Sequence, residues 1–131
     1  MDIVRRNTDY ALRAMAHLAR NYGGESISTR VIAESQEISY QLACKLMQKM
    51  NDAGLVNSTM GPKGGFTLSK PSSKINLLEI IEAVQGRITV NRCMDKDDPC
   101  PRNKECPLNG KMKEMQKYIV GSLKGSTLGD L

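Results

Sequence analysis

Residues 28–54 read STRVIAESQEISYQLACKLMQKMNDAG, and this stretch decides the fold that the sequence predicts. Ser28 and Ser39 each occupy a position where a helix N-cap is expected, and Gly54 stands where a helix should end. The expected apolar faces consist of Val31, Ile32 and Ser35 in the first helix, and of Leu42, Ala43, Leu46, Met47 and Met50 in the second. Two helices separated by about three residues are typical of a helix-turn-helix.

The next stretch, LVNSTMGPKGGFTLS at residues 55–69, predicts a β-hairpin. Two β-prone runs, 55–59 and 66–69, flank the turn cluster 61–65, where glycines permit positive φ and Pro62 favours a turn. A hairpin that directly follows a helix-turn-helix is a natural wing for DNA binding.

Three further helices are expected on either side of this region. The first spans residues 2–22, ends at two glycines and has an apolar stripe of Ala11, Ala14, Met15, Leu18 and Tyr22. Another spans 75–85, with Asn76 as its cap, Gly86 as its stop and a buried side of Leu77, Leu78, Ile80, Ile81 and Val84. The last begins after Pro107, and its stripe is Leu108, Met112, Met115, Ile119 and Leu123. We expect this stripe, from about 108 to 124, to pack against the same helix of a second copy.

Length and composition limit the possible classes. A chain of 131 residues is the size of one domain and can bury a core without disulfides. Its N-terminus lacks the features of a signal peptide, and it has no apolar run of the roughly 18 residues that a membrane span needs, so we expect a cytoplasmic protein without a membrane partner. Residues 1–75 hold ten Lys and Arg against six Asp and Glu, a net charge of +4 that suits a polyanion such as DNA.

The helix-turn-helix and the wing contain the residues that we expect at double-stranded DNA. Such a motif places its second helix in the major groove, while neighbouring groups hold phosphates. Gln41 has the side chain that pairs with an adenine edge, and lysines contact either bases or phosphate. The helix N-terminus at Ser28 is a favourable anion site. The expected DNA-binding residues are Ser28, Thr29, Arg30, Ser39, Tyr40, Gln41, Lys45, Lys49, Lys63 and Gly64.

Three of the four cysteines fall in CMDKDDPCPRNKECP, residues 93–107, with the spacing C-x6-C-x5-C. These gaps are wider than the knuckles of structural zinc sites, and they differ from the ferredoxin run. A proline-bent loop with basic neighbours that favour thiolates could still wrap an iron–sulfur cluster. A redox-active thiol cluster without metal is the alternative. Cys44, inside a predicted helix, is expected to be a small buried hydrophobe.

Over nearly its whole length the chain resembles the IscR/NsrR group of winged-helix transcription regulators, in the Rrf-two superfamily. The motifs that carry this resemblance are TDYALRAM at 8–15, ISYQLACKLMQKMNDAGLV at 38–56, GPKGGFTLS at 61–69, INLLEIIEAVQG at 75–86, the three cysteines and TLGDL at the end. The resemblance implies a homodimer whose operator affinity depends on an iron–sulfur cluster bound by Cys93, Cys100 and Cys106 of each subunit.

The resemblance also suggests the fourth ligand. IscR-like members complete a two-iron site with a histidine at the position of Asn109, whereas NsrR-like members use an acidic residue of the other subunit at the position of Asp9. Asp9 therefore favours a four-iron–four-sulfur over a two-iron–two-sulfur cluster, and a sensor of nitric oxide or redox state over IscR-like control of iron–sulfur assembly. The first cysteine gap is one residue longer than in these relatives, and the wing position of their minor-groove arginine is Met60.

Together these features predict a mainly α fold with a small β-hairpin: a winged helix-turn-helix followed by a long C-terminal dimerisation helix. The expected division is 1–86 for DNA binding, 87–107 for the cysteine loop and 108–131 for the dimerisation helix and tail. The predicted function is a transcription regulator, mainly a repressor, and not an enzyme, because no catalytic motif is present. The alternative within the same fold is a regulator that senses thiol oxidation or a partner protein without iron.

Overall fold

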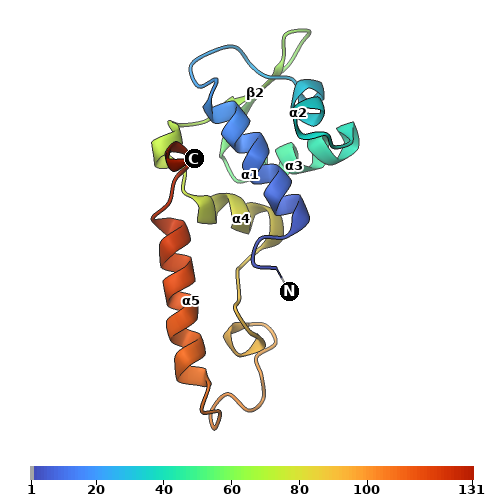
Figure 1. Cartoon of the computed structure of the whole chain (residues 1–131). Helices are drawn as coiled ribbons and strands as arrows, with labels where there is room; N and C mark the ends of the chain where they lie inside the picture. Colours follow the sequence, from blue (N-terminus) through green and yellow to red (C-terminus); the bar gives the residue numbers. More distant parts are fainter. Residues whose placement is uncertain (1) are drawn as a thin grey trace.

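Four helices and a hairpin form the upper part of the molecule in a computed structural model that describes residues 2–131, and one long helix extends below them (Figure 1). The elements are α1 (Arg6–Ala19), α2 (Thr29–Gln36), α3 (Tyr40–Asp52), β1 (Val56–Thr59), β2 (Gly65–Leu68), α4 (Leu77–Gln85) and α5 (Asn109–Lys124), with short 3-10 turns at Ser72–Lys74, Arg92–Met94 and Leu128–Asp130. The predicted mainly α fold with one hairpin is confirmed. No helix among the described residues is long and apolar enough to span a membrane.

Side-chain caps set the ends of the helix-turn-helix. The hydroxyl of Ser28 accepts a hydrogen bond from the N–H of Val31 at 3.2 Å, and that of Ser39 accepts from the N–H of Leu42 at 3.1 Å. Both predicted N-caps are therefore confirmed. Glu37, with φ of 54°, ends α2 in the left-handed region and turns the chain toward α3.

The hairpin is held against the segment that leads into α2. Its antiparallel register runs from Val56 opposite Leu68 to Thr59 opposite Gly65. Ile27 and Phe66 exchange two backbone hydrogen bonds of 3.0 and 2.9 Å, so the hairpin is tied to the residue just before the Ser28 cap. Gly65 allows this close approach, because a β-carbon there would lie 2.2 Å from the carbonyl oxygen of Ile27.

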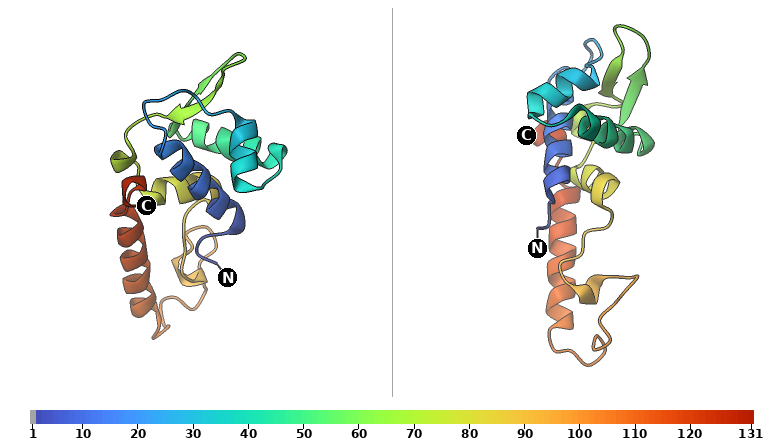
Figure 2. Two further views of the ribbon diagram at one scale, coloured as in Figure 1. Left: turned by 45° about the horizontal axis from the view of Figure 1, so that its top comes forward. Right: turned by 90° about the vertical axis from the view of Figure 1, so that its right-hand side faces the viewer.

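One hydrophobic core joins α1, α3, α4 and the hairpin. It also includes Leu128, from the last turn of the chain, which is only 3% exposed. The N–H of Leu128 donates to the carbonyl of Ile75 at 3.0 Å, and the N–H of Leu77 donates to that of Ser126 at 2.8 Å. The chain therefore runs down into the cysteine loop, returns along α5 and ends against α1 and the 3-10 turn Ser72–Lys74 (Figure 2).

Three local expectations from the sequence need correction. On α2 the buried residues are Ile32 and Ala33, whereas Val31 is 46% exposed and Ser35 is exposed. This helix buries two consecutive residues rather than a stripe, because its 8 residues make only about two turns. The first helix is shorter than expected and runs from Arg6 to Ala19, so Tyr22 of its expected stripe lies beyond it and is 51% exposed. Cys44 is half-buried rather than buried.

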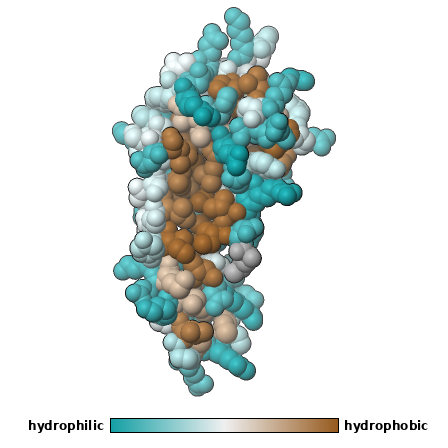
Figure 3. Space-filling model, viewed as in Figure 1, coloured by the Kyte–Doolittle hydropathy of each residue, from teal (hydrophilic) through white to brown (hydrophobic). Residues whose placement is uncertain are grey.

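The apolar stripe expected on the last helix is only partly covered within one chain, because Met112, Ile119 and Leu123 are half-buried and the other members are exposed. Leu108, Met115 and Tyr118 are 57%, 44% and 78% exposed, and Gln116 is the one residue of α5 that is buried. A continuous apolar area runs along the face on which α1, α4 and the upper part of α5 lie (Figure 3). An apolar area of this kind on a folded chain marks an interaction surface.

Candidate nucleic-acid interface and cysteine loop

A groove of about 620 Å³ lies between the hairpin, the N-terminal end of α2 and one side of α3; we call it the wing groove. It brings together residues that are distant in the sequence: Ser28, Thr29 and Arg30 from α2, Tyr40, Gln48 and Asn51 from α3, and Ser58 to Pro62 and Gly64 to Phe66 from the hairpin. Five of the residues predicted to bind DNA line this groove, namely Ser28, Thr29, Arg30, Tyr40 and Gly64. Ser39 and Lys63 are exposed but do not line it.

Arg30 and Tyr40 form a contact between the N-terminal ends of α2 and α3. The guanidinium carbon of Arg30 lies 5.7 Å from the centre of the Tyr40 ring, in the range of a cation–π interaction. A hydrogen bond with the side chain of Cys44 raises the pKa of the Tyr40 hydroxyl above its usual value of 10.0. The hydroxyl of Tyr40, like that of an ordinary tyrosine, is neutral at physiological pH and can donate a hydrogen bond to a phosphate or a base.

The outward face of α3 presents Gln41, Lys45 and Gln48. All three are exposed, and their spacing of four and three residues places them in one row. Gln48 donates to Asp52 at 2.8 Å, whereas the side chains of Gln41 and Lys45 make no hydrogen bond or ion pair within residues 2–131. These two are the side chains of the row that are free to reach another molecule.

Lys49 has a structural role that the sequence did not predict. Its ammonium group donates a hydrogen bond to the carbonyl oxygen of Val84 at 3.0 Å, which lies in the last turn of α4. A cation at this end of a helix interacts favourably with the helix dipole and satisfies a free carbonyl. The lysine predicted to bind DNA thus joins the recognition helix to α4.

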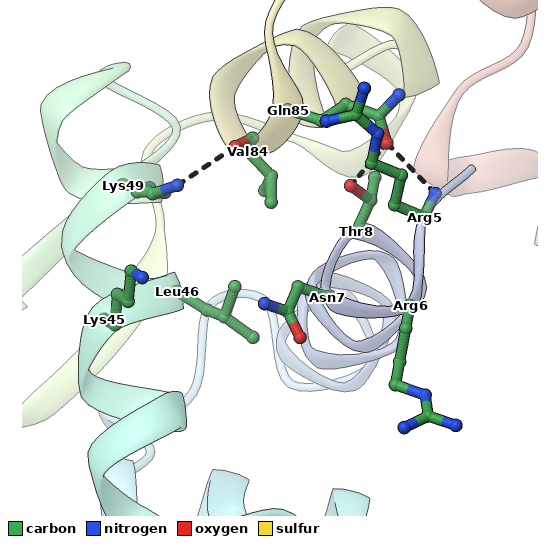
Figure 4. A pocket seen from close by; sticks show the side chains of 9 residues that line it. All are labelled: Arg5, Arg6, Asn7, Thr8, Lys45, Leu46, Lys49, Val84 and Gln85. Atoms are coloured by element: carbon green, nitrogen blue, oxygen red, sulfur yellow. Dashed lines mark hydrogen bonds between the residues drawn. The ribbon is translucent and has the colours of Figure 1, made fainter. Parts of the chain in front are cut away.

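A second groove, of about 300 Å³, lies on the other side of α3, between that helix, the start of α1 and the end of α4 (Figure 4). We call it the α1 groove. Its lining consists of Arg5, Arg6, Asn7, Thr8, Lys45, Leu46, Lys49, Val84 and Gln85. Sequence reasoning missed Arg5 and Arg6, although the adjacent pair of arginines at the start of a predicted helix was a visible signal.

Gln85 fixes the beginning of α1 within this groove (Figure 4). Helix α1 has no side-chain cap of its own. Instead, Oε1 of Gln85 accepts hydrogen bonds from the N–H of Arg5 at 3.1 Å and from the hydroxyl of Thr8 at 2.7 Å. Its Nε2 donates to the carbonyl of Ile3 at 2.8 Å. One side chain at the end of α4 therefore holds the N-terminal turn of α1.

The cysteine loop carries Cys93, Cys100 and Cys106, all half-buried and none in a disulfide. Cys93 lies in the 3-10 turn Arg92–Met94, and the other two lie in irregular segments. Over residues 2–131 no three or more Cys, His, Asp or Glu side chains are grouped closely enough to hold a metal ion. The single chain thus presents three free thiols on one loop without bringing them together.

Polar side chains attach the two ends of this loop. Asn103 donates to the carbonyl of Cys93 at 2.9 Å, and Asn109 donates to Asn103 at 2.9 Å. The amide of Gln116 accepts from the N–H of Val90 at 2.9 Å and donates to the carbonyl of Ile88 at 2.6 Å. The base of the loop is therefore fixed to α5, whose first residue is Asn109.

Asp9 lies on α1 and is paired with Arg13 of the same chain. The carboxylate oxygen and the guanidinium nitrogen are 3.3 Å apart, and the Asp9 side chain is 48% exposed. An exposed pair of this kind contributes little to stability, so the carboxylate can be released to another partner at small cost.

A family model described as Rrf2, iron-dependent transcriptional regulator, matches residues 4–131. The chain belongs to the Rrf2 family. This Rrf2 chain is 32% identical over 122 residues to the HTH-type transcriptional regulator IscR of Escherichia coli K12, an alignment that covers 93% of this chain and 75% of IscR. The resemblance to the IscR-containing superfamily that the sequence motifs indicated is therefore confirmed.

Solved structures of other family members have the same fold. CymR of B. subtilis, described as the global cysteine regulator, superposes with a TM-score of 0.79 at 25% identity, over 99% of the Rrf2 chain and 95% of CymR. IscR of T. potens superposes with a TM-score of 0.76 at 26% identity, over 97% and 83% of the two chains. The winged-helix architecture and a role in transcription regulation follow from these similarities together.

Proposed function

We propose that the protein is a homodimeric repressor whose affinity for operator DNA is controlled by an iron–sulfur cluster. The observation that carries the DNA-binding part is the wing groove, which gathers Ser28, Thr29, Arg30, Tyr40 and Gly64 beside the exposed row of α3. Such a protein would act in the cytoplasm, where it meets chromosomal DNA, and it would regulate transcription rather than catalyse a reaction.

The DNA contacts divide between the row of α3 and the wing groove. Gln41 and Lys45 face outward from the helix that enters the major groove, so they would reach base edges and nearby phosphates. The capped N-terminus of α2 and Arg30 border the wing groove, where backbone N–H groups and a cation favour a phosphate. Lys63, exposed near the tip of the hairpin, would follow the backbone of the duplex.

The donor set of the cysteine loop fits an iron–sulfur cluster in kind, because three thiols without disulfides lie on one loop with little regular structure. Cys93, Cys100 and Cys106 would hold it, and Asp9 of the partner subunit would supply a fourth, weak ligand. A bound cluster would supply a group that nitric oxide or oxidants modify. We favour a four-iron cluster, on the family resemblance at Asp9.

The second copy would cover the apolar face of α5. Leu108, Met115 and Tyr118 leave large apolar side chains in water in a single chain, and dimer formation would remove them from it. We therefore assign residues 108–131 to the dimer, 87–107 to the cluster and 1–86 to DNA.

The deciding experiment is iron and sulfide analysis with an absorbance spectrum of protein purified without oxygen. We expect iron and sulfide in equal amounts, about four per subunit for a four-iron cluster. Cys93→Ala, Cys100→Ala and Cys106→Ala should each remove the visible absorbance, whereas Cys44→Ala, on α3, should keep it. Equal iron contents in all four variants would contradict the ligand assignment.

The alternative is a cluster-free regulator that senses thiol oxidation or a partner protein. Two observations favour it: the three thiols are not grouped in the described part of the single chain, and the fold is as similar to the cysteine regulator CymR as to IscR. Iron-free protein that still binds DNA, and that loses binding on oxidation of the loop cysteines, would establish this alternative.

A further inference from the structure

The exposed row of α3 lies between two grooves. Residues of an α-helix are separated by about 100° around its axis, so Gln41, Lys45 and Gln48 point in nearly one direction. Tyr40 and Asn51 lie on one flank of this row and line the wing groove. Lys49 and Leu46 lie on the opposite flank and line the α1 groove, and Lys45 borders that groove as well.

The dimensions of DNA relate the two grooves to the two strands of one duplex. The major groove is about 12 Å wide, and a helix with its side chains is about 10–12 Å across. A helix inserted there has one sugar-phosphate strand on each flank. If α3 enters the major groove, the wing groove faces one strand and the α1 groove faces the other.

The α1 groove has the charge that a phosphate strand requires. Four of its lining residues are cationic, namely Arg5, Arg6, Lys45 and Lys49, and none is a carboxylate. The ion pairs of residues 2–131 involve other cations: Arg13, Lys70, Arg92 and Lys111. The positive charge of the groove is therefore not neutralised by ion pairs within this part of the chain.

The groove is also preformed. The hydrogen bonds of Gln85 to the N–H of Arg5 and to the buried hydroxyl of Thr8 hold the first turn of α1 in place. Lys49 holds the opposite wall by its bond to Val84, which leaves Arg5, Arg6 and Lys45 as the groups available to a ligand. Sites whose walls are fixed in advance lose less entropy on binding.

We propose that the α1 groove is a second phosphate-binding surface, which holds the DNA strand opposite to the one that meets the wing. Arg5 and Arg6 contribute the charge, and Asn7, at the mouth between α1 and α3, offers an amide donor to a phosphate oxygen. This inference rests on the proposed DNA-binding function. It adds the N-terminal turn of α1 to an interface that would otherwise comprise only the helix-turn-helix and the wing.

The test compares Arg5→Gln/Arg6→Gln with a matched control, Arg20→Gln/Lys74→Gln, which removes two exposed cations that line neither groove and lie outside the expected dimer helix. The probe is a short duplex selected from a randomised pool with the wild-type protein. Binding is measured between about 50 and 200 mM salt. We expect the slope of log K against log salt to become less steep by about 0.9 for each phosphate that the variant no longer neutralises, and the control to keep the wild-type slope.

Ethylation interference on the same duplex identifies the phosphates that Arg5 and Arg6 bind. Wild-type protein should be blocked by ethylated phosphates on both strands that border the half-site, and the Arg5→Gln/Arg6→Gln protein should become insensitive to ethylation on one strand only. An unchanged slope and interference pattern in this variant would overturn the second phosphate surface while leaving DNA binding intact. Failure of the wild-type protein to select any duplex would overturn the DNA-binding function itself, and the phosphate surface with it.

Discussion

The hydroxyl of Thr8 donates a hydrogen bond to Oε1 of Gln85, 2.7 Å away and 77 residues further along the chain. Thr8 is fully buried, and Gln85 is the last residue of α4. Gly86, which follows it, begins the segment that leads into the cysteine loop. One glutamine side chain, at the end of α4 and just before this segment, therefore holds the start of α1, where Arg5 and Arg6 lie.

Replacement of this glutamine should cost stability. Gln85→Ala removes three hydrogen bonds and leaves the hydroxyl of Thr8 without its acceptor, so we expect the free energy of unfolding to fall by about 1–3 kcal/mol. Denaturant titration of the purified protein measures this change. Gln41→Ala, at an exposed position of α3, is the matched control and should change stability by less than about 0.5 kcal/mol. Equal stabilities of the two variants would show that the cap is unimportant.

Replacement of Lys45 should affect DNA binding, whereas replacement of Lys49 should affect stability. Lys49→Ala removes the hydrogen bond to the carbonyl of Val84 and should lower the free energy of unfolding by about 1 kcal/mol. Lys45→Ala, at an exposed site, should leave stability unchanged but weaken binding to operator DNA and make its salt dependence less steep. Denaturant titration and binding assays on both variants check this. A loss of stability in Lys45→Ala but not in Lys49→Ala would contradict a stabilising hydrogen bond between α3 and α4.

The wing should be sensitive to one added methyl group. Gly65→Ala would place a carbon 2.2 Å from the carbonyl oxygen of Ile27, so the hairpin must move away from the segment that precedes α2. We expect a loss of about 1–3 kcal/mol in stability and weaker DNA binding, because Thr59 to Gly65 would no longer be aligned with α3. Gly110→Ala is the control, since a β-carbon there has no neighbour within 4 Å. Identical melting temperatures for both variants would show that the close contact between the hairpin and Ile27 does not contribute to stability.

Gln116 should determine how firmly the cysteine loop is attached to α5. Gln116→Leu keeps a similar volume but leaves the carbonyl of Ile88 and the N–H of Val90 without partners, at a cost of about 1–3 kcal/mol. We expect faster amide hydrogen exchange around Val90 under native conditions, and mass spectrometry measures this exchange. Lys117→Ala, exposed on the same helix, should exchange like the wild-type protein. Unchanged amide exchange around Val90 in Gln116→Leu would show that Gln116 does not attach the cysteine loop to α5.

Sequence reasoning was most successful where a local pattern has one structural solution. Ser28, Ser39 and Asn76 were predicted as N-caps, and all three accept the expected backbone hydrogen bonds. It was less successful on α2, where Val31 is exposed although its spacing fits an apolar face. A helix of 8 residues has too few turns for periodicity to identify its buried side.

The sequence by itself determined the elements, the wing, the row of polar residues on α3 and the membership of the three cysteines in one loop, because each depends on residues that are close together in the chain. Only the tertiary structure decided which side chains share a site. Gln85 meets Thr8 across 77 residues of chain, Lys49 meets Val84 across 35, and Leu128 joins the core from the far end. Such pairs are selected by packing and by the requirement that buried polar groups find partners, and neither condition leaves a periodic signal in the sequence.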